Sequence, residues 1–137
     1  MPSMNSRAKG RRLDGYYPEY VLFDIETTGL SPVYDEIIEL SAVKVKDGNI
    51  IDTFDTLIRP DRKIPRSATA VNGITNDMVK DAPMYDVIVP RFLEFCGDDI
   101  VVAHNASFDT GFMRMNAEEL GLKFDNTILD TKTLSHI

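Results

Sequence analysis

The sequence has no tryptophan, only one cysteine and only two histidines among its 137 residues. The single cysteine, Cys96, rules out a disulfide within the chain and is typical of a protein of the reducing cytoplasm. No apolar run approaches the roughly 20 residues that a membrane-spanning helix needs. The basic start of the chain also lacks the apolar stretch of a secretory signal. These absences exclude a disulfide scaffold and predict a cytoplasmic protein without a membrane partner.

The composition is that of an ordinary globular protein, with 43% hydrophobic and 27% charged residues. A chain of this length suffices for one domain with a sizeable core and is too short for two. The net charge of −7 argues against tight binding of duplex nucleic acid, because phosphate contacts usually require a basic surface. It is compatible with weak binding of a few terminal nucleotides.

The chain is predicted to have two parts. Residues 1–19 contain four clustered basic side chains and are expected to form a flexible basic N-terminal segment, with an arm that touches nucleic acid as the alternative. Residues 20–137 are expected to form a single α/β domain.

Alternating and apolar runs predict five strands, at residues 20–25, 36–45, 49–58, 100–103 and 127–129. Asp47-Gly48 is a strong hairpin signal, so the first three strands should form an antiparallel meander. The uniformly apolar fourth strand is expected to be parallel and buried. Helical patterns cover residues 107–120 and residues 84–95, the latter with a kink or an offset start at Pro90. Ser67 and Thr75 are predicted to be the N-caps of two short helices.

Two carboxylates, Asp24 and Glu26, end the first predicted strand and project from the same face, because strand side chains alternate. Such a pair repels itself unless a divalent cation neutralises it, and hard cations prefer oxygen ligands. The alternative is a solvated strand face. The small, hydroxyl-rich turn that follows favours the metal site, because a substrate backbone could approach it closely.

A second polar turn, His104-Asn105, follows the fourth predicted strand and leads to Asp109 near the start of a helix. Sites in α/β sheets gather where strand ends meet helix starts, so Asp109 could join Asp24 and Glu26 as a third carboxylate. The alternative is an aspartate that only complements the helix dipole.

The stretches FDIETTGL (23–30) and AHNASFD (103–109) resemble the first two motifs of the DEDD exonucleases, the DnaQ-like branch of the ribonuclease H-like fold. Residues 70–75, AVNGIT, are similar to a segment that this family places beside its first motif. The resemblance runs from about Tyr20 to the end of the chain. Within the family it is greatest to the DEDDh proofreading domains of C-type bacterial replicative polymerases.

The resemblance implies a mixed sheet with flanking helices and 3′→5′ hydrolysis at single-stranded DNA or RNA ends, with a replicative polymerase as an expected partner. It also implies two Mg²⁺ or Mn²⁺ ions, roughly 3.5–4 Å apart. Their ligands would be Asp24, which bridges both, Glu26 and Asp109.

The remaining predicted site residues are those expected to hold the terminal nucleotide: Thr27, Thr28, Gly29 and Leu30, with Leu30 as an apolar wedge against a base. His104 and Asn105 are expected either to organise their turn or to contact phosphate. Asp130 is interpreted as a helix N-cap, with a fourth metal ligand as the alternative.

The family's third motif, a histidine followed five residues later by an aspartate on a helix after the last strand, does not follow here. His136 has no such partner, because the sequence ends at Ile137. The expectation is an exonuclease domain that is incomplete at its C-terminus and poorly active alone. Two alternatives stay open: a nuclease-like module that binds nucleic acid or a polymerase without turnover, and an unrelated α/β protein with a chance acidic pair.

Overall fold

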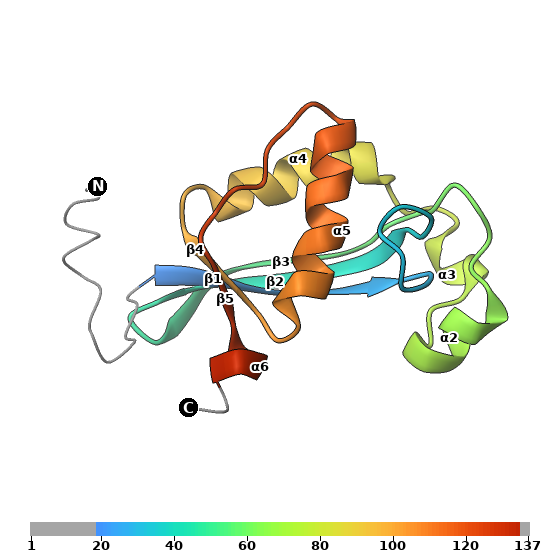
Figure 1. The fold of residues 1–137 in the computed structure, drawn as a ribbon. Helices are drawn as coiled ribbons and strands as arrows, with labels where there is room; N and C mark the ends of the chain where they lie inside the picture. Colours follow the sequence, from blue (N-terminus) through green and yellow to red (C-terminus); the bar gives the residue numbers. More distant parts are fainter. Residues whose placement is uncertain (1–18, 135–137) are drawn as a thin grey trace.

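A computed structural model describes residues 19–134 and contains one five-stranded sheet in the order β3-β2-β1-β4-β5 (Figure 1). The first three strands are antiparallel neighbours, and β4 and β5 run parallel to β1, so the predicted meander with added parallel strands is confirmed. The strands are β1 (Glu19–Thr27), β2 (Ile37–Lys46), β3 (Asn49–Leu57), β4 (Ile100–Ala103) and β5 (Ile128–Asp130).

The helices are α2 (Arg66–Asn72), α3 (Asn76–Val79), α4 (Tyr85–Cys96), α5 (Ala106–Glu119) and α6 (Thr131–Leu134). The long helices α4 and α5 cover one face of the sheet, and the short α2 and α3 lie beyond the C-terminal end of β1 (Figure 1). No helix within residues 19–134 is long and apolar enough to cross a membrane. The predicted N-terminal segment 1–19 lies outside the described residues except for Glu19, which begins β1, and His136 lies outside them too.

The Asp47-Gly48 turn sets the register of the β2–β3 hairpin. Both residues have positive φ, 52° and 83°, as the tight hairpin turns that match strand twist require. Glycine adopts this conformation freely, and aspartate is among the few other residues that tolerate it. The hairpin predicted from this dipeptide is confirmed.

Strand β1 divides its side chains between two faces. Val21, Phe23 and Ile25 are buried in the main core beneath α4 and α5. By the two-residue repeat, Asp24 and Glu26 project from the opposite face. The strand thus anchors the core with one face and presents two carboxylates with the other. It is also longer than predicted, because its pairing with β2 continues to Thr27.

Two of the predicted local features at helices need correction. Ser67 is not an N-cap: Pro65 holds that position in α2, with an extended backbone whose carbonyl accepts the first helical hydrogen bonds. Pro90 does not offset the start of α4, which begins at Tyr85 and continues through the proline, so of the two predicted alternatives only the kink stays open. The Thr75 prediction is confirmed, because its hydroxyl accepts the N–H of Met78 at 3.2 Å.

The aromatic centre of the core yields a stability prediction. The Phe92 side chain is fully buried, with its ring centroid 5.2 Å from that of Phe23 and 6.0 Å from that of Phe54. We expect Phe92→Ala to lower the free energy of unfolding by about 3–5 kcal/mol, because it removes this burial and leaves a cavity. Urea unfolding measures the loss. Ile51→Ala, at a side chain that is 54% exposed, is the control and should cost less than about 1 kcal/mol.

Candidate active site

The pairing register of β1 with β2 shifts at the end of β1 that carries the two carboxylates. Glu26 lies opposite Glu39 of β2, but the next residue, Thr27, lies opposite Ile37, so the register shifts between them. The shift leaves one extra residue, Ile38, in β2, and an extra residue of this kind bends the strand that contains it. The shift was not predicted from the sequence, because it depends on which β2 residues pair with β1.

Asp109 reaches the same region from α5. Strand β4 pairs with β1, and α5 begins at Ala106, directly after the turn that follows β4. The carbonyl oxygen of Asn105 accepts the N–H groups of Phe108 and Asp109, at 3.0 and 3.1 Å, and thereby sets the first turn of the helix. The Asp109 side chain is only 4% exposed.

Burial, and then the charges of Asp24, Glu26 and Asp130, raise the pKa of Asp109 from 3.8 to about 7. A helix N-terminus favours a carboxylate by typically 0.3–1 kcal/mol. A rise of the pKa from 3.8 to about 7 corresponds to roughly 4 kcal/mol against the charged carboxylate. The helix dipole therefore does not account for this aspartate, which stands in a cluster of acidic groups.

Glu26 shows an effect in the same direction. Its pKa is raised, first by burial and then by the charges of Asp24 and Glu39. Sequence reasoning overlooked Glu39, although the predicted β1–β2 pairing could have suggested it as a cross-strand neighbour. Asp24 itself is exposed. The charges of Asp24 and Glu26 thus act together on the buried Asp109.

Asp130 connects the ends of β5 and α5. One carboxylate oxygen accepts the N–H of Lys132 at 2.9 Å, which supports the predicted N-cap role at α6. The other accepts the N–H of Ala106, the first residue of α5, at 3.3 Å. Asp130 therefore also holds the start of the helix that carries Asp109.

His104 and Asn105 are both exposed. The Nδ1 atom of His104 lies 3.1 Å from the hydroxyl oxygen of Thr131, and the residue lines a shallow hollow together with Asp24. The Asn105 side chain makes no capping bond to α5. Within this turn, the organising bonds to α5 come from the Asn105 backbone, not from the His104 ring.

A hollow of about 380 Å³ lies beside Glu26 and is lined mainly by apolar side chains and backbone. The predicted turn 27–30 forms one wall, and residues of α2 within and before the AVNGIT segment form the other. Leu30 and Val71, which are 84% and 86% exposed, both line the hollow. The Asn72 side-chain amide donates to the Thr27 carbonyl at 3.2 Å and ties the walls together.

Hydrogen bonds and close packing within the segment 28–36 fix the shape of the turn 27–30. Thr28 is buried, and its hydroxyl accepts the N–H of Glu36 at 2.9 Å, so this side chain faces inward. Residue 29 must be glycine because the Asp35 carboxylate lies so close to its backbone that a Cβ there would stand 2.4 Å from it. That carboxylate is fixed by the N–H of Ser31 at 2.9 Å.

The chemistry of the donors fits a hard divalent cation, since buried, mutually repelling carboxylate oxygens are what such ions neutralise. No three or more acidic, histidine or cysteine side chains within residues 19–134 are arranged so that they could hold a metal ion as they stand. Because Asp24 is exposed, its carboxylate can turn about its own bonds without a change in the backbone.

The profile of the family described as Exonuclease matches residues 21–136, nearly the whole chain. The chain therefore belongs to this exonuclease family, in its DnaQ-like branch. It is 56% identical over 119 residues to a DNA polymerase III PolC-type from Listeria welshimeri and 50% identical over 117 residues to that of Bacillus subtilis. These matches cover 85% and 84% of this chain, which spans only about 8% of the length of either relative.

Solved structures confirm the ribonuclease H-like fold. Exonuclease X in complex with 5′ overhanging duplex DNA is 33% identical, with a TM-score of 0.66 over 85% of this chain and 62% of that one. Exonuclease I of E. coli, bound to a dA13 oligonucleotide, has a TM-score of 0.77 at 17% identity, over 85% of this chain and 29% of that one. The second likeness concerns the fold alone.

The raised pKa of Asp109 makes the stability depend on pH. In the unfolded chain this carboxyl ionises near pH 3.8, whereas in the folded chain it stays protonated until about pH 7. Its stabilising contribution is present below about pH 4 and is lost as the pH rises toward 7. With a chelator present, the free energy of unfolding relative to Asp109→Asn should fall by about 2–3 kcal/mol from pH 5 to pH 8. Parallel urea-unfolding profiles of the two proteins would contradict this.

Proposed function

We propose that this chain is the 3′→5′ exonuclease domain of a replicative DNA polymerase and removes nucleotides from DNA 3′ ends with the help of two divalent cations. The observation that carries the proposal is the buried carboxylate of Asp109 under the charges of Asp24 and Glu26, beside the hollow at the end of β1. Such a cluster is favourable when cations bind it. Proofreading of newly made DNA is the role that this activity would serve.

The names of the relatives and of the similar structures support the proposed polymerase partner and the proposed substrate. Those named DNA polymerase III PolC-type share about half of their matched residues with this chain, and the structures similar to it contain duplex or single-stranded DNA. These names favour DNA over RNA as the substrate, and a replicative polymerase as the attached or associated partner. The cytoplasm is the compartment where such a polymerase would work.

Asp24, Glu26 and Asp109 would hold Mg²⁺ or Mn²⁺, which when bound makes water a better nucleophile and neutralises charge on the scissile phosphate. Asp109 must lose its proton for this role, and the positive ion would favour that loss. The exposed Asp24 would turn toward Asp109. A related structure, 17% identical, is described as the zinc-bound form of E. coli exonuclease I with single-stranded DNA, so this fold admits a divalent metal.

The hollow beside Glu26 would receive the terminal nucleotide. Leu30 and Val71 offer apolar side chains from opposite walls, which suits the faces of a base. Thr28 would contribute through its backbone, since its hydroxyl is already engaged. The small polar turn lets a sugar-phosphate backbone approach the carboxylates closely.

A binding module without turnover is the second candidate, and one observation favours it. Hydrolysis of this kind is often helped by a base that takes a proton from water, which typically contributes about 10²–10⁴-fold. His104 is the only histidine within residues 19–134, and its Nδ1 contacts Thr131. We therefore expect turnover by the 137-residue chain to be slow.

The direct test incubates the chain with Mn²⁺ and an oligonucleotide labelled at its 5′ end. We expect slow shortening from the 3′ end, abolished by Asp24→Ala and unchanged by Asp77→Ala, which alters a carboxylate on α3 outside the cluster. Binding without any shortening would favour the second candidate. Shortening that survives Asp24→Ala would refute the proposed site.

Calorimetry with Mn²⁺ tests the ligand assignment separately from catalysis. Asp24→Ala should weaken Mn²⁺ binding more than tenfold, because a bridging carboxylate would serve both ions. Asp130→Ala should weaken it by less than about threefold, since both Asp130 oxygens already accept backbone N–H groups. Equal losses, or a larger loss for Asp130→Ala, would overturn the assignment.

A further inference from the structure

The turn that lines the hollow is fastened to Glu36. The N–H of Thr28 donates to the Glu36 carbonyl at 2.9 Å, and the N–H of Glu36 donates to the Thr28 hydroxyl at the same distance. These two bonds close the loop 28–36 at its base. The position of Thr28 therefore depends on the position of the Glu36 backbone.

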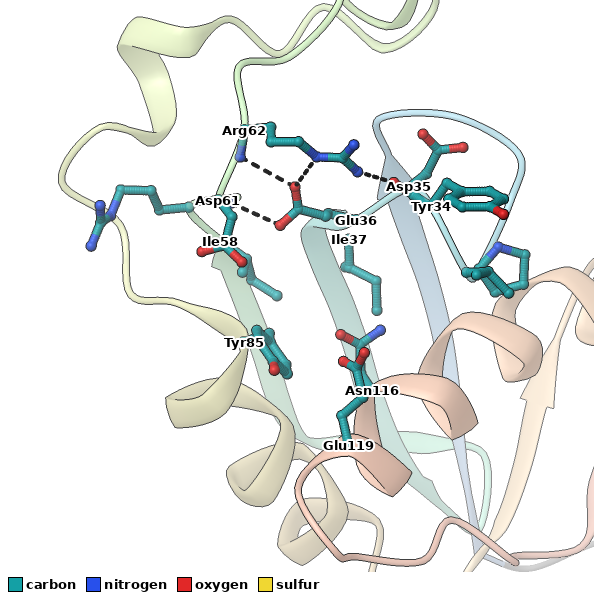
Figure 2. A pocket seen from close by; sticks show the side chains of 13 residues that line it. Tyr34, Asp35, Glu36, Ile37, Ile58, Asp61, Arg62, Tyr85, Asn116 and Glu119 are labelled. Carbon is teal, nitrogen blue, oxygen red and sulfur yellow. Dashed lines mark hydrogen bonds and ion pairs between the residues drawn. The ribbon is translucent and has the colours of Figure 1, made fainter.

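The Glu36 side chain is in turn bound to the segment that follows β3. Its carboxylate accepts the N–H of Asp61 at 2.7 Å and the N–H of Arg62 at 3.3 Å, and it lies 3.7 Å from the Nε atom of Arg62 (Figure 2). The Arg62 guanidinium also donates to the Tyr34 carbonyl, within the same loop. The Glu36 carboxylate, 22% exposed, thus accepts two backbone hydrogen bonds and makes one ion pair with a segment about 25 residues away.

A second hollow, of about 340 Å³, borders this junction and is lined by residues 32–36 of the loop and by Ile37 of β2 (Figure 2). The loop therefore has open space along residues 32–36 as well as along residues 28–30. Because hollows border the loop at both stretches, its hydrogen bonds contribute much of what fixes its position.

The loop also reaches the helix that carries Asp109. A Cβ built on Gly111 of α5 would stand 3.9 Å from the Cγ of Pro32, an ordinary packing contact. The loop thus runs from the end of β1 past α5, two residues from Asp109. A shift of the loop would change the shape of the nucleotide hollow.

We propose that Glu36 is a positioning residue for the substrate: its carboxylate, held by Asp61 and Arg62, fixes the loop 28–36 in the form that receives the terminal nucleotide. This inference rests on the proposed function. A loop that is already ordered loses less conformational entropy when the substrate binds, so pre-organisation appears as tighter binding. Glu36 does not line the hollow beside Glu26 and is not among the charges that act on Glu26 and Asp109, so metal binding should not depend on it.

The test measures the affinity of the chain for a fluorescent oligothymidylate with phosphorothioate linkages at its 3′ end, which resist cleavage. We expect Glu36→Ala to weaken binding by about 5–10-fold, because hydrogen bonds to a charged group are lost. Hydrogen exchange at the Thr28 amide should accelerate at least about tenfold. The affinity for Mn²⁺ should change by less than about twofold.

Three further variants sharpen the result. Glu36→Gln keeps an acceptor oxygen without the charge and should restore part of the affinity. Arg62→Gln leaves Glu36 in place at an exposed position, so it reports on the same junction even if Glu36→Ala folds poorly. Glu19→Ala is the matched control: it removes an ion pair of similar length, 3.6 Å to Lys46, at the opposite end of β1, and should change nothing.

The outcomes separate this inference from the proposed function. If the unaltered chain does not bind the oligonucleotide, the proposed function fails. If it binds and Glu36→Ala and Arg62→Gln bind equally well, only the positioning role is refuted. Equal losses of DNA and Mn²⁺ affinity would also refute it, because they would indicate general damage to the fold.

Discussion

The alternation of side chains along β1 is the constraint on which the rest of the structure depends. One set, which includes Val21, Phe23 and Ile25, is buried against α4 and α5 and fixes the strand in the sheet. The other set presents Asp24 and Glu26 on the opposite face. A slip of one residue would exchange the two sets, burying carboxylates and exposing the core. The same hydrophobic packing that folds the domain therefore determines where the acidic site lies.

Without bound cations, the acidic cluster destabilises the fold. Burial and neighbouring charges raise the pKa of Asp109 to about 7, and Glu26 is affected in the same direction. Such repulsion is tolerated where a core holds the backbone firmly, and it is relieved by a bound cation. The bond from Asp130 to Ala106 fixes the start of the helix that carries Asp109, whereas the bonds from Glu36 to the segment after β3 fix the loop 28–36. We infer that the first bond supports the acidic cluster and that the others support the shape of the neighbouring hollow.

Much of this fold could be predicted from residue patterns. The Asp47-Gly48 hairpin and the uniformly apolar fourth strand gave the mixed sheet, because both signals are local. The register shift after Glu26 and the proposed role of Glu36 could not be predicted in this way, since each arises from contacts between distant segments. Glu39 could have been inferred from the predicted β1–β2 pairing, as a cross-strand neighbour of Glu26. The Ser67 prediction was wrong because Pro65, with an extended backbone, is the N-cap of α2, two residues before the predicted hydroxyl cap.

The central claim is that divalent cations bind at Asp24, Glu26 and Asp109. Paramagnetic broadening by Mn²⁺ in amide NMR spectra tests it most directly, because the effect falls off steeply with distance from the ion. At substoichiometric Mn²⁺ the account predicts that the amide signals of residues 24–27 and 106–110 broaden first. Broadening centred instead on the second hollow, which borders the Glu36 junction near Asp35, Asp61 and Glu119, would contradict it.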